Sequence, residues 1–411
     1  MAFWRGPATA LASLLAATSV LAADGSGTDN PALLGLEPEA IAETAPPEIF
    51  DPPLDLDWRL ALRGAYELSS SGGAFTAIAA PEFTLTHQAL NTDLAVSGAS
   101  ELVTSDTGES RISSLTLGAD GRYQLGALSH LDGTLDLSLT QSKPDDPSLP
   151  ANTAIAPVIF GGDAGASFTQ GLGMFEGTLR GSLGRSIHGE TTLDDSSTID
   201  NSAENDWRVG AGARLGYKLT PLLTPFIDGG VEWQRFDAPS PSLLVYLDAL
   251  TYTAKAGVSY RHDTTLSAEA AAGIAWRDYT DPSLTDAAGF TADASVTFRP
   301  SETLTLDASL DTALAPSELT PGDTVTSYVA AGSATYIVNP WITLRGSAGW
   351  SSEHTLGTGD VTTIASVGAG LDYKVTDHAA LTADYAFSRT DAPPDPVEDT
   401  QAISVGVKFL R

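Results

Sequence analysis

The stretch DWRVGAGARLGYKLTPLLTPFIDGGVEW, residues 206–233, decides the fold class of this chain. Apolar or aromatic residues occupy every second position of its first half: Trp207, Val209, Ala211, Ala213, Leu215 and Tyr217. The positions between them hold arginine, lysine and glycine. Because successive side chains of a β-strand point to opposite faces, this spacing predicts a strand with one apolar and one polar face. After the turn LTPLLTP, Asp228 and Glu232 return on the polar face of the next strand with opposite charge.

The same alternation recurs from Trp58 to the C-terminus, for example in WRLALRGAYEL (58–68), LTYTAKAGVSYRH (250–262) and TLTLDASLD (303–311). These runs are longer than the usual strands of soluble sheets. We expect about eighteen strands, with sixteen as the alternative. The predicted spans are 57–68, 74–87, 92–103, 110–125, 129–142, 158–172, 173–188, 205–219, 225–236, 249–261, 264–277, 287–299, 303–314, 324–338, 341–352, 362–375, 378–389 and 400–410.

The connections between these runs alternate in length. Short ones include 339–340 and 376–377, and long ones include 187–206, 237–248, 278–288 and 390–400. One rim of short turns and one rim of long loops is typical of a transmembrane, antiparallel, up-and-down β-barrel. The expected fold is therefore an all-β barrel with short periplasmic turns and long extracellular loops.

The sequence predicts three regions in this chain. Residues 1–22 read as a secretory signal peptide, because Arg5 precedes an apolar run that ends in small residues. Residues 23–56 are rich in proline and acid, and we expect a disordered periplasmic leader. Residues 57–411 form the expected barrel.

Composition excludes several classes of function. The chain of 411 residues has a net charge of −31, so nucleic acid is not an expected partner. Cysteine is absent, which excludes disulfides and thiolate chemistry.

The apolar face carries aromatic residues at a regular spacing. Pairs eight to ten positions apart recur in five strands. In a tilted strand this separation is roughly 20–25 Å, close to the apolar thickness of an outer membrane. We predict two membrane girdles, made of Trp58, Tyr66, Trp207, Tyr217, Tyr252, Tyr260, Phe290, Phe298, Tyr328 and Tyr336.

The opposite face carries too many ions for a dry core, since each unpaired buried charge would cost several kcal/mol. A water-filled lumen removes this cost. The predicted lumen-facing residues are Arg59, Arg63, Arg208, Arg214, Lys218, Asp228, Glu232, Lys255, Arg261, Glu269, Asp293, Arg299, Asp307, Arg345, Asp372, Lys374 and Asp384.

Charge also differs between the two rims. The long loops are acidic, whereas Lys218, Arg261, Arg299 and Lys374 each follow an aromatic residue before a short turn. An acidic outer vestibule and a basic periplasmic ring would bias ion passage. Alternatively, the acids keep the loops soluble and the bases pair with acids on neighbouring strands, for which Lys218 with Asp228 and Arg261 with Glu269 are candidates.

Four stretches of the chain carry a resemblance to a known family: LTPLLTPFIDGGVEWQRFD (219–237), AAGIAWRDYTDPSL (271–284), VTFRPSETLTLDASL (296–310) and VNPWITLRGSAGW (338–350). Through them the chain resembles a family of Gram-negative outer-membrane proteins, the β-barrel porins of the second type, common in alphaproteobacteria. The resemblance implies location in the outer membrane, contact with its lipid and lipopolysaccharide, and insertion by the barrel-assembly machinery. One departure is that Leu410 and Arg411 follow Phe409, whereas such barrels usually end in an aromatic residue.

The leading functional hypothesis is a passive channel for ions or small hydrophilic solutes. A structural or adhesive barrel is the main alternative, followed by an autotransporter-type translocator or a barrel enzyme. His188 and His354 are the histidines expected near the long-loop rim, and neither lies in a catalytic or metal-spaced motif. We therefore predict no catalytic residue, no cofactor and no metal site.

Overall fold

The structure is a computed structural model that describes residues 54–69, 72–106, 108–144, 149–150, 152–316, 324–356, 359–393 and 397–411. The predicted signal peptide lies outside these residues. The predicted leader lies outside them as well, apart from residues 54–56, which belong to the first strand.

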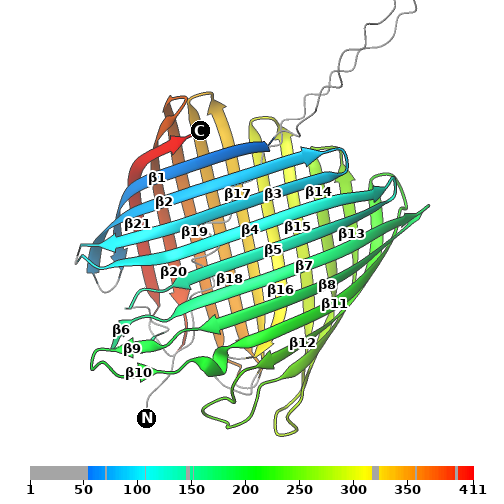
Figure 1. Cartoon of the computed structure of the whole chain (residues 1–411), viewed down its shortest axis with the longest axis horizontal. Helices are drawn as coiled ribbons and strands as arrows, with labels where there is room; N and C mark the ends of the chain where they lie inside the picture. The colour runs from blue at the N-terminus through cyan, green and yellow to red at the C-terminus, as the bar shows by residue number, and fades with distance from the viewer. Residues whose placement is uncertain are drawn as a thin grey trace, which may run out of the picture.

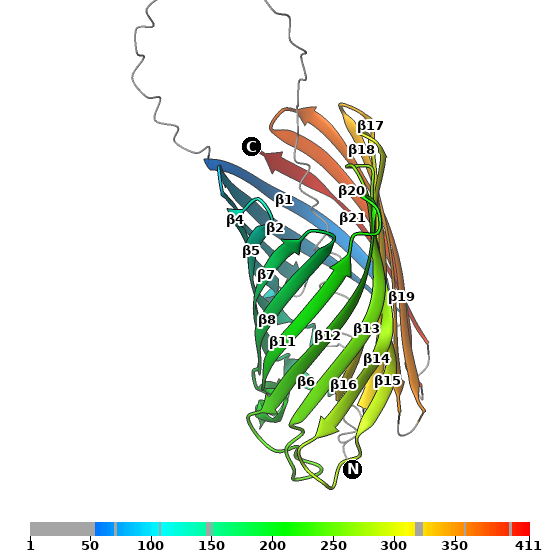
Figure 2. The same cartoon turned by 90° about the vertical axis from the view of Figure 1, so that its right-hand side faces the viewer.

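Eighteen strands form one closed antiparallel sheet, shown from two sides in Figures 1 and 2. This confirms the predicted barrel and its strand number. The strands are β1 Leu54–Ser69, β2 Gly72–Ala89, β3 Thr92–Ser105, β4 Ser110–Gly126, β5 Ser129–Gln141, β7 Val158–Leu172, β8 Phe175–His188, β11 Asp206–Tyr217, β12 Leu223–Phe236, β13 Ala249–His262, β14 Leu266–Tyr279, β15 Ala287–Ser301, β16 Leu304–Pro316, β17 Thr324–Asn339, β18 Ile342–Thr355, β19 Val361–Thr376, β20 Ala379–Asp391 and β21 Glu398–Leu410.

The barrel closes where the first strand pairs with the last. β1 and β21 are antiparallel neighbours from Arg59 opposite Leu410 to Leu68 opposite Gln401. Phe409, the third residue from the C-terminus, lies directly opposite Leu60 at this seam, so this aromatic residue occupies an outer-face position although Leu410 and Arg411 follow it. Both ends of the barrel sequence therefore lie at the rim of the short turns.

The opposite rim carries the longer connections, of which 142–157, 189–205 and 237–248 are the longest. Two of them contribute a small three-stranded sheet that the sequence did not predict. It consists of β6 Thr153–Ile155, β9 Thr191–Leu193 and β10 Thr198–Ile199, followed by the 3₁₀ turn η1 Ser202–Glu204. In Figure 1 this sheet lies at the lower left, beyond the ends of the barrel strands.

The two faces of the wall can be told apart from their contacts. On β11 the side chains of Val209 and Leu215 are exposed; Val209 lies between Trp233 and Leu183, and Leu215 lies opposite Ile227. Side chains of the other face form ion pairs between strands that are not adjacent, such as Arg214 of β11 with Glu269 of β14. Ion pairs between non-adjacent strands require side chains that point toward one another, so this face is the concave inner face of the barrel.

No helix in the described ranges is long and apolar enough to cross a bilayer.

An arginine introduced halfway along a barrel strand should lower the stability of the barrel by different amounts on the two faces of the wall. Val405, which is 60% exposed, lies on the outer face, and its neighbour Ser404 lies on the inner face opposite Asp384. We expect Val405→Arg to destabilise the barrel by about 2–4 kcal/mol, the cost of arginine in mid-bilayer hydrocarbon. We expect Ser404→Arg to cost less than about 1 kcal/mol, because water and Asp384 can solvate it. Denaturant titration of protein folded in phospholipid vesicles measures both, and equal costs would contradict the assignment of the faces.

Candidate functional site: the charged inner wall

The residues that the sequence predicted to face the lumen all lie on the inner face or at its short-turn rim. Register and alternation give this placement. By element they are Arg59 and Arg63 on β1, Arg208 and Arg214 on β11, Lys218 after it, Asp228 and Glu232 on β12, Lys255 and Arg261 on β13, Glu269 on β14, Asp293 and Arg299 on β15, Asp307 on β16, Arg345 on β18, Asp372 and Lys374 on β19, and Asp384 on β20.

Asp228 is the centre of the first ion-pair network. Its carboxylate accepts hydrogen bonds from Arg180 on β8 (2.7 Å, Nη1 to Oδ2) and from Arg214 on β11 (3.1 Å, Nε to Oδ2). Arg214 also donates to Glu269 at 2.8 Å and packs its guanidinium over the ring of Phe226, 4.0 Å from the centroid. The network therefore ties together four strands, β8, β11, β12 and β14. The Asp228 side chain is only 7% exposed, so both arginines are needed to compensate its charge.

A second network lies on β18–β21, across the barrel from the first in strand order. Arg345 pairs with Asp372 at 3.0 Å and with Asp384 at 2.7 Å. Lys408 of β21 pairs with the same Asp372 at 2.8 Å. Here too each bond but one skips a strand, because the inner face brings side chains of alternate strands together.

Other inner-face cations are paired in the same way. Lys255 on β13 contacts Asp293 on β15 at 2.5 Å, and Arg63 on β1 contacts Glu101 on β3 at 3.1 Å. The two pairings suggested by the sequence are wrong: Asp228 binds Arg180 and Arg214, and Glu269 binds Arg214. Tilt and register decide which charges meet, and neither can be read from alternation.

The predicted basic ring at the short-turn rim is partly neutralised. Lys218 pairs with Glu176 at 2.9 Å, and Lys374 pairs with Asp377 at 2.9 Å. The hydrogen bond and charge of Lys374 lower the pKa of Asp377, which is therefore ionised at neutral pH. Among the described residues, Arg261 and Arg299 form no ion pair. The ring thus presents fewer free charges than the sequence alone indicated.

Some inner-face carboxylates have no cation. Within the part of the chain that the structure describes, Asp120 on β4 and Asp136 on β5 form no ion pair, and Asp136 lies directly opposite Asp163 of β7. Asp163 itself is 3.4 Å from Arg208. The wall formed by β4, β5 and β7 is therefore acidic.

Sequence reasoning missed several members of these networks. Arg180, Lys408, Glu101, Asp136 and Asp163 all lie on the inner face. The sequence did contain a signal for their inner-face position, because apolar residues such as Leu179, Leu135 and Val407 stand directly before Arg180, Asp136 and Lys408. Glycine-rich runs in β7 and β8 weaken that alternation.

Most of the predicted girdle aromatics are exposed on the outer face. Eight of the ten are at least 36% exposed, namely Trp58, Tyr66, Trp207, Tyr217, Tyr252, Phe290, Phe298 and Tyr336. Tyr260 and Tyr328 are only partly exposed, and Tyr328 packs edge-on against His354 with ring centroids 5.7 Å apart. Neighbouring strands add further aromatics, since Phe175 lies opposite Tyr217 and Phe83 lies opposite Trp58.

Neither rim histidine belongs to a cluster with metal-binding geometry. His188 is 3.8 Å from Glu204, and His354 contacts Tyr328. Across the described ranges, no group of three or more histidine, aspartate or glutamate side chains is placed to hold a metal ion.

Eighteen long strands closed into a ring, apolar outside and charged inside, define a transmembrane β-barrel. The chain belongs to the family described as "Putative beta-barrel porin 2", which matches residues 64–410. This confirms the resemblance found in the sequence and places the protein in the outer membrane of a Gram-negative bacterium. No curated protein matches the chain.

Comparison with solved structures finds outer-membrane proteins at low sequence identity. The FrpB iron transporter from Neisseria meningitidis (F5-1 variant) is 9% identical over 81% of this chain, with a TM-score of 0.42, and this chain spans 63% of its length. OpdK from Pseudomonas aeruginosa is 11% identical, with 87% of this chain and 99% of that one covered and a TM-score of 0.41. OccK3 (OpdO) from the same organism is 12% identical, with 87% and 96% covered and a TM-score of 0.40.

The Asp228 network gives a testable contribution to stability. We expect Asp228→Asn to destabilise the folded barrel by about 1–3 kcal/mol, because it leaves Arg180 and Arg214 facing each other without their shared anion, partly screened by water. Asp136→Asn is the matched control. This substitution removes a carboxylate that faces another carboxylate, so the variant barrel should be as stable as the native barrel, or more stable, at pH 7. Denaturant titration compares the two, and a larger loss for Asp136→Asn would contradict the pairing.

Proposed function

We propose that this protein is a passive channel for ions or small hydrophilic solutes across the outer membrane. The observation that carries the proposal is the inner wall, where ion-paired and unpaired charges occur on both sides of the barrel. A packed apolar plug would leave these charges dry at a cost of several kcal/mol each, whereas a water-filled passage solvates them. Barrels with 16–18 strands are wide enough for an aqueous channel.

The proposal extends to cation preference. Asp120 and Asp136 are inner-face carboxylates that form no ion pair among the described residues, and the inner arginines are largely engaged with partners. An ion in the passage therefore meets more free negative than free positive charge on the wall of β4, β5 and β7. A lumen lined by uncompensated acids raises the local cation concentration.

One contact supports partial narrowing of the outer mouth. Lys143, just after β5, pairs with Glu67 on β1, although β2, β3 and β4 lie between these strands. Arg111 on the inner face of β4 donates to the carbonyl of Gln141 at 2.7 Å, which holds the start of the same connection inward. The connection between β5 and β7 thus begins by extending across the inner side of the wall. The connection between β12 and β13 lies differently, since its Tyr246 lines a cleft with Trp207 of the outer face.

The outer face supports proposals about the membrane partners. We propose that the ten predicted aromatics lie at the two headgroup levels, where amphipathic rings are favoured. We also propose that the barrel-assembly machinery acts on β21, whose outer face ends with Val405, Val407 and Phe409. No catalytic residue is assigned.

Planar-bilayer recording tests the channel. Purified full-length protein should produce discrete conductance steps, and in a salt gradient the reversal potential should have the sign of a cation-preferring pore. The Asp120→Asn/Asp136→Asn double variant should move the reversal potential toward zero, because it removes two free anions from the wall. Protein that is folded by its heat-modifiable electrophoretic mobility, yet never conducts, would overturn the proposal.

The Lys143–Glu67 contact should influence gating. We expect Glu67→Gln to release the connection and increase the frequency of transitions between conductance levels, measured at constant voltage. Glu232→Gln is the matched control, since Glu232 is an exposed inner-face carboxylate that forms no ion pair among the described residues. Equal changes in both variants would show that lost charge, and not the lost contact, is responsible.

A further inference from the structure

Two arginines interrupt the apolar pattern of the outer face at the long-loop rim. Arg185 on β8 and Arg235 on β12 both lie directly opposite Trp207 of β11. The next outer-face positions toward mid-barrel are apolar, with Leu183 and Trp233 on either side of Val209. Arginine on the lipid-facing wall is costly at the midplane and nearly free of cost at the headgroups. The position of the two arginines therefore corresponds to the headgroup level of the outer leaflet.

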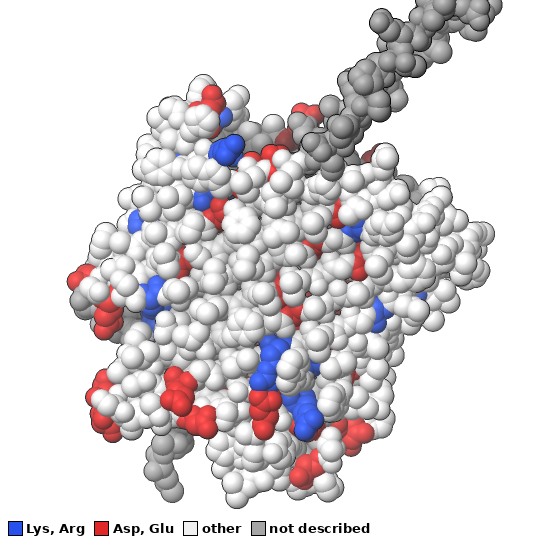
Figure 3. Space-filling view, in the orientation of Figure 1, with Lys and Arg blue, Asp and Glu red and all other residues white. Residues whose placement is uncertain are grey.

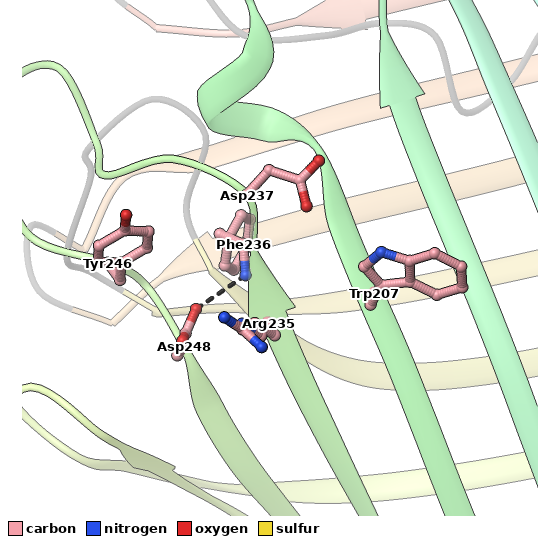
Figure 4. Close-up of a pocket in the computed structure, with 6 residues that line it drawn as sticks. All are labelled: Trp207, Arg235, Phe236, Asp237, Tyr246 and Asp248. Atoms are coloured by element: carbon pink, nitrogen blue, oxygen red, sulfur yellow. Dashed lines mark hydrogen bonds between the residues drawn. The ribbon is translucent and has the colours of Figure 1, made fainter.

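A cleft of about 530 Å³ opens at this point. It is lined by Trp207, Arg235, Phe236, Asp237, Tyr246 and Asp248. In Figure 4, Arg235 lies between Trp207 and Tyr246, which come from β11 and from the connection between β12 and β13. Both rings are exposed, at 42% and 47%. The cleft thus offers a guanidinium between two accessible aromatic rings.

The remaining charges of the cleft are already engaged. Arg185 donates from Nη1 to Oδ1 of Asp237 at 3.0 Å and lies 5.0 Å from the centroid of the Trp207 ring. The hydrogen bond from Arg185 lowers the pKa of Asp237, which stays ionised and paired at neutral pH. Asp248 accepts the backbone N–H of Phe236 at 2.8 Å. Among the described residues Arg235 forms no ion pair.

Charged side chains gather visibly at this place. Figure 3 shows an outer wall that is mostly uncharged, with basic and acidic side chains concentrated over the ends of β11 and β12. Arginine is suited to phosphate because its planar fork donates two parallel hydrogen bonds. Exposed tryptophan and tyrosine at the interface present apolar faces on which a sugar ring can pack.

We propose that this cleft binds the headgroup of a phosphorylated glycolipid of the outer leaflet. The phosphate contacts Arg235, and the attached sugar packs between Trp207 and Tyr246. The carboxylates of Asp237 and Asp248 have lone pairs left to accept hydrogen bonds from sugar hydroxyls. They would repel a bare phosphate, so the cleft favours a ligand that combines a phosphate with hydroxyl donors. The site lies outside the barrel and is independent of the proposed channel.

Ligand binding to the full-length protein in nonionic detergent tests this proposal. The probes are diphosphorylated lipid A, dephosphorylated lipid A, phosphatidylglycerol and inorganic phosphate. We expect diphosphorylated lipid A to bind at least about tenfold more tightly than the other three. Arg235→Gln should weaken lipid A binding about tenfold, the loss expected for one charge-assisted contact.

Arg389 provides the matched control. It lies on the outer face near the same rim, opposite Ala365, and is 3.9 Å from Asp399. Arg389→Gln should change lipid A affinity less than about twofold, since its charge is already paired. Equal losses in the two variants, or phosphatidylglycerol or inorganic phosphate bound as tightly as lipid A, would overturn the proposal.

Two measurements keep the outcome unambiguous. Heat-modifiable electrophoretic mobility reports whether each variant is folded. If Arg235→Gln does not fold, competition between diphosphorylated and dephosphorylated lipid A for the native protein tests whether the phosphate is recognised. Single-channel conductance of Arg235→Gln should equal that of the native protein. A failure of the glycolipid site is therefore distinguishable from a failure of the channel.

Discussion

The structure depends on one constraint, that no backbone N–H or C=O group may be left unpaired in hydrocarbon. Each such group would cost several kcal/mol, because the bilayer core contains no water to replace the missing partner. The β1–β21 seam meets this constraint, since it pairs the two strands that would otherwise be sheet edges. Opening the seam would expose both edges along their whole length. The closed ring is therefore a condition for membrane insertion.

Closure also determines what each side chain meets. Outer-face side chains diverge into lipid, and those on the inner face converge. Convergence is why Arg214 of β11 reaches Glu269 of β14 and why Lys408 of β21 reaches Asp372 of β19. Exposed ion pairs contribute little individually, but pairs that skip a strand fix the relative position of three or four strands at once. The strands of the inner wall are thus held in place by ion pairs between their own side chains.

The period of two in the sequence was enough to predict the barrel and the place of nearly every strand. Each predicted span overlaps an observed strand, including the early glycine-rich ones such as β7 Val158–Leu172. The same period also predicted which face each polar residue occupies, because alternate residues of a strand point to opposite sides of the barrel wall. Alternation could not predict β6, β9 and β10, which are too short to show a period.

Partners were not predictable for a different physical reason. The sequence suggested Lys218 with Asp228, whereas Lys218 meets Glu176 and Asp228 meets Arg180 and Arg214. Which inner charges meet depends on the tilt of the strands and on the curvature of the wall, and these are properties of the whole ring. Tyr328 was predicted to face lipid from its spacing alone, but the ring of His354 covers part of it.

Arg180 and Arg185 on β8 show that the position of an arginine in the strand alternation decides whether its side chain lies inside or outside the barrel. They lie an odd number of residues apart, so Arg180 points inward to Asp228 while Arg185 points outward to Asp237. Inside the barrel an arginine at any height can find water or an acid, so its position alone carries little information. Outside, only the headgroup levels tolerate a charge, and even there an aromatic ring or a carboxylate must accompany it. An outer-wall arginine without an ion pair, as Arg235 is among the described residues, is for that reason better evidence of a bound headgroup than any charge on the inner wall is of a particular solute.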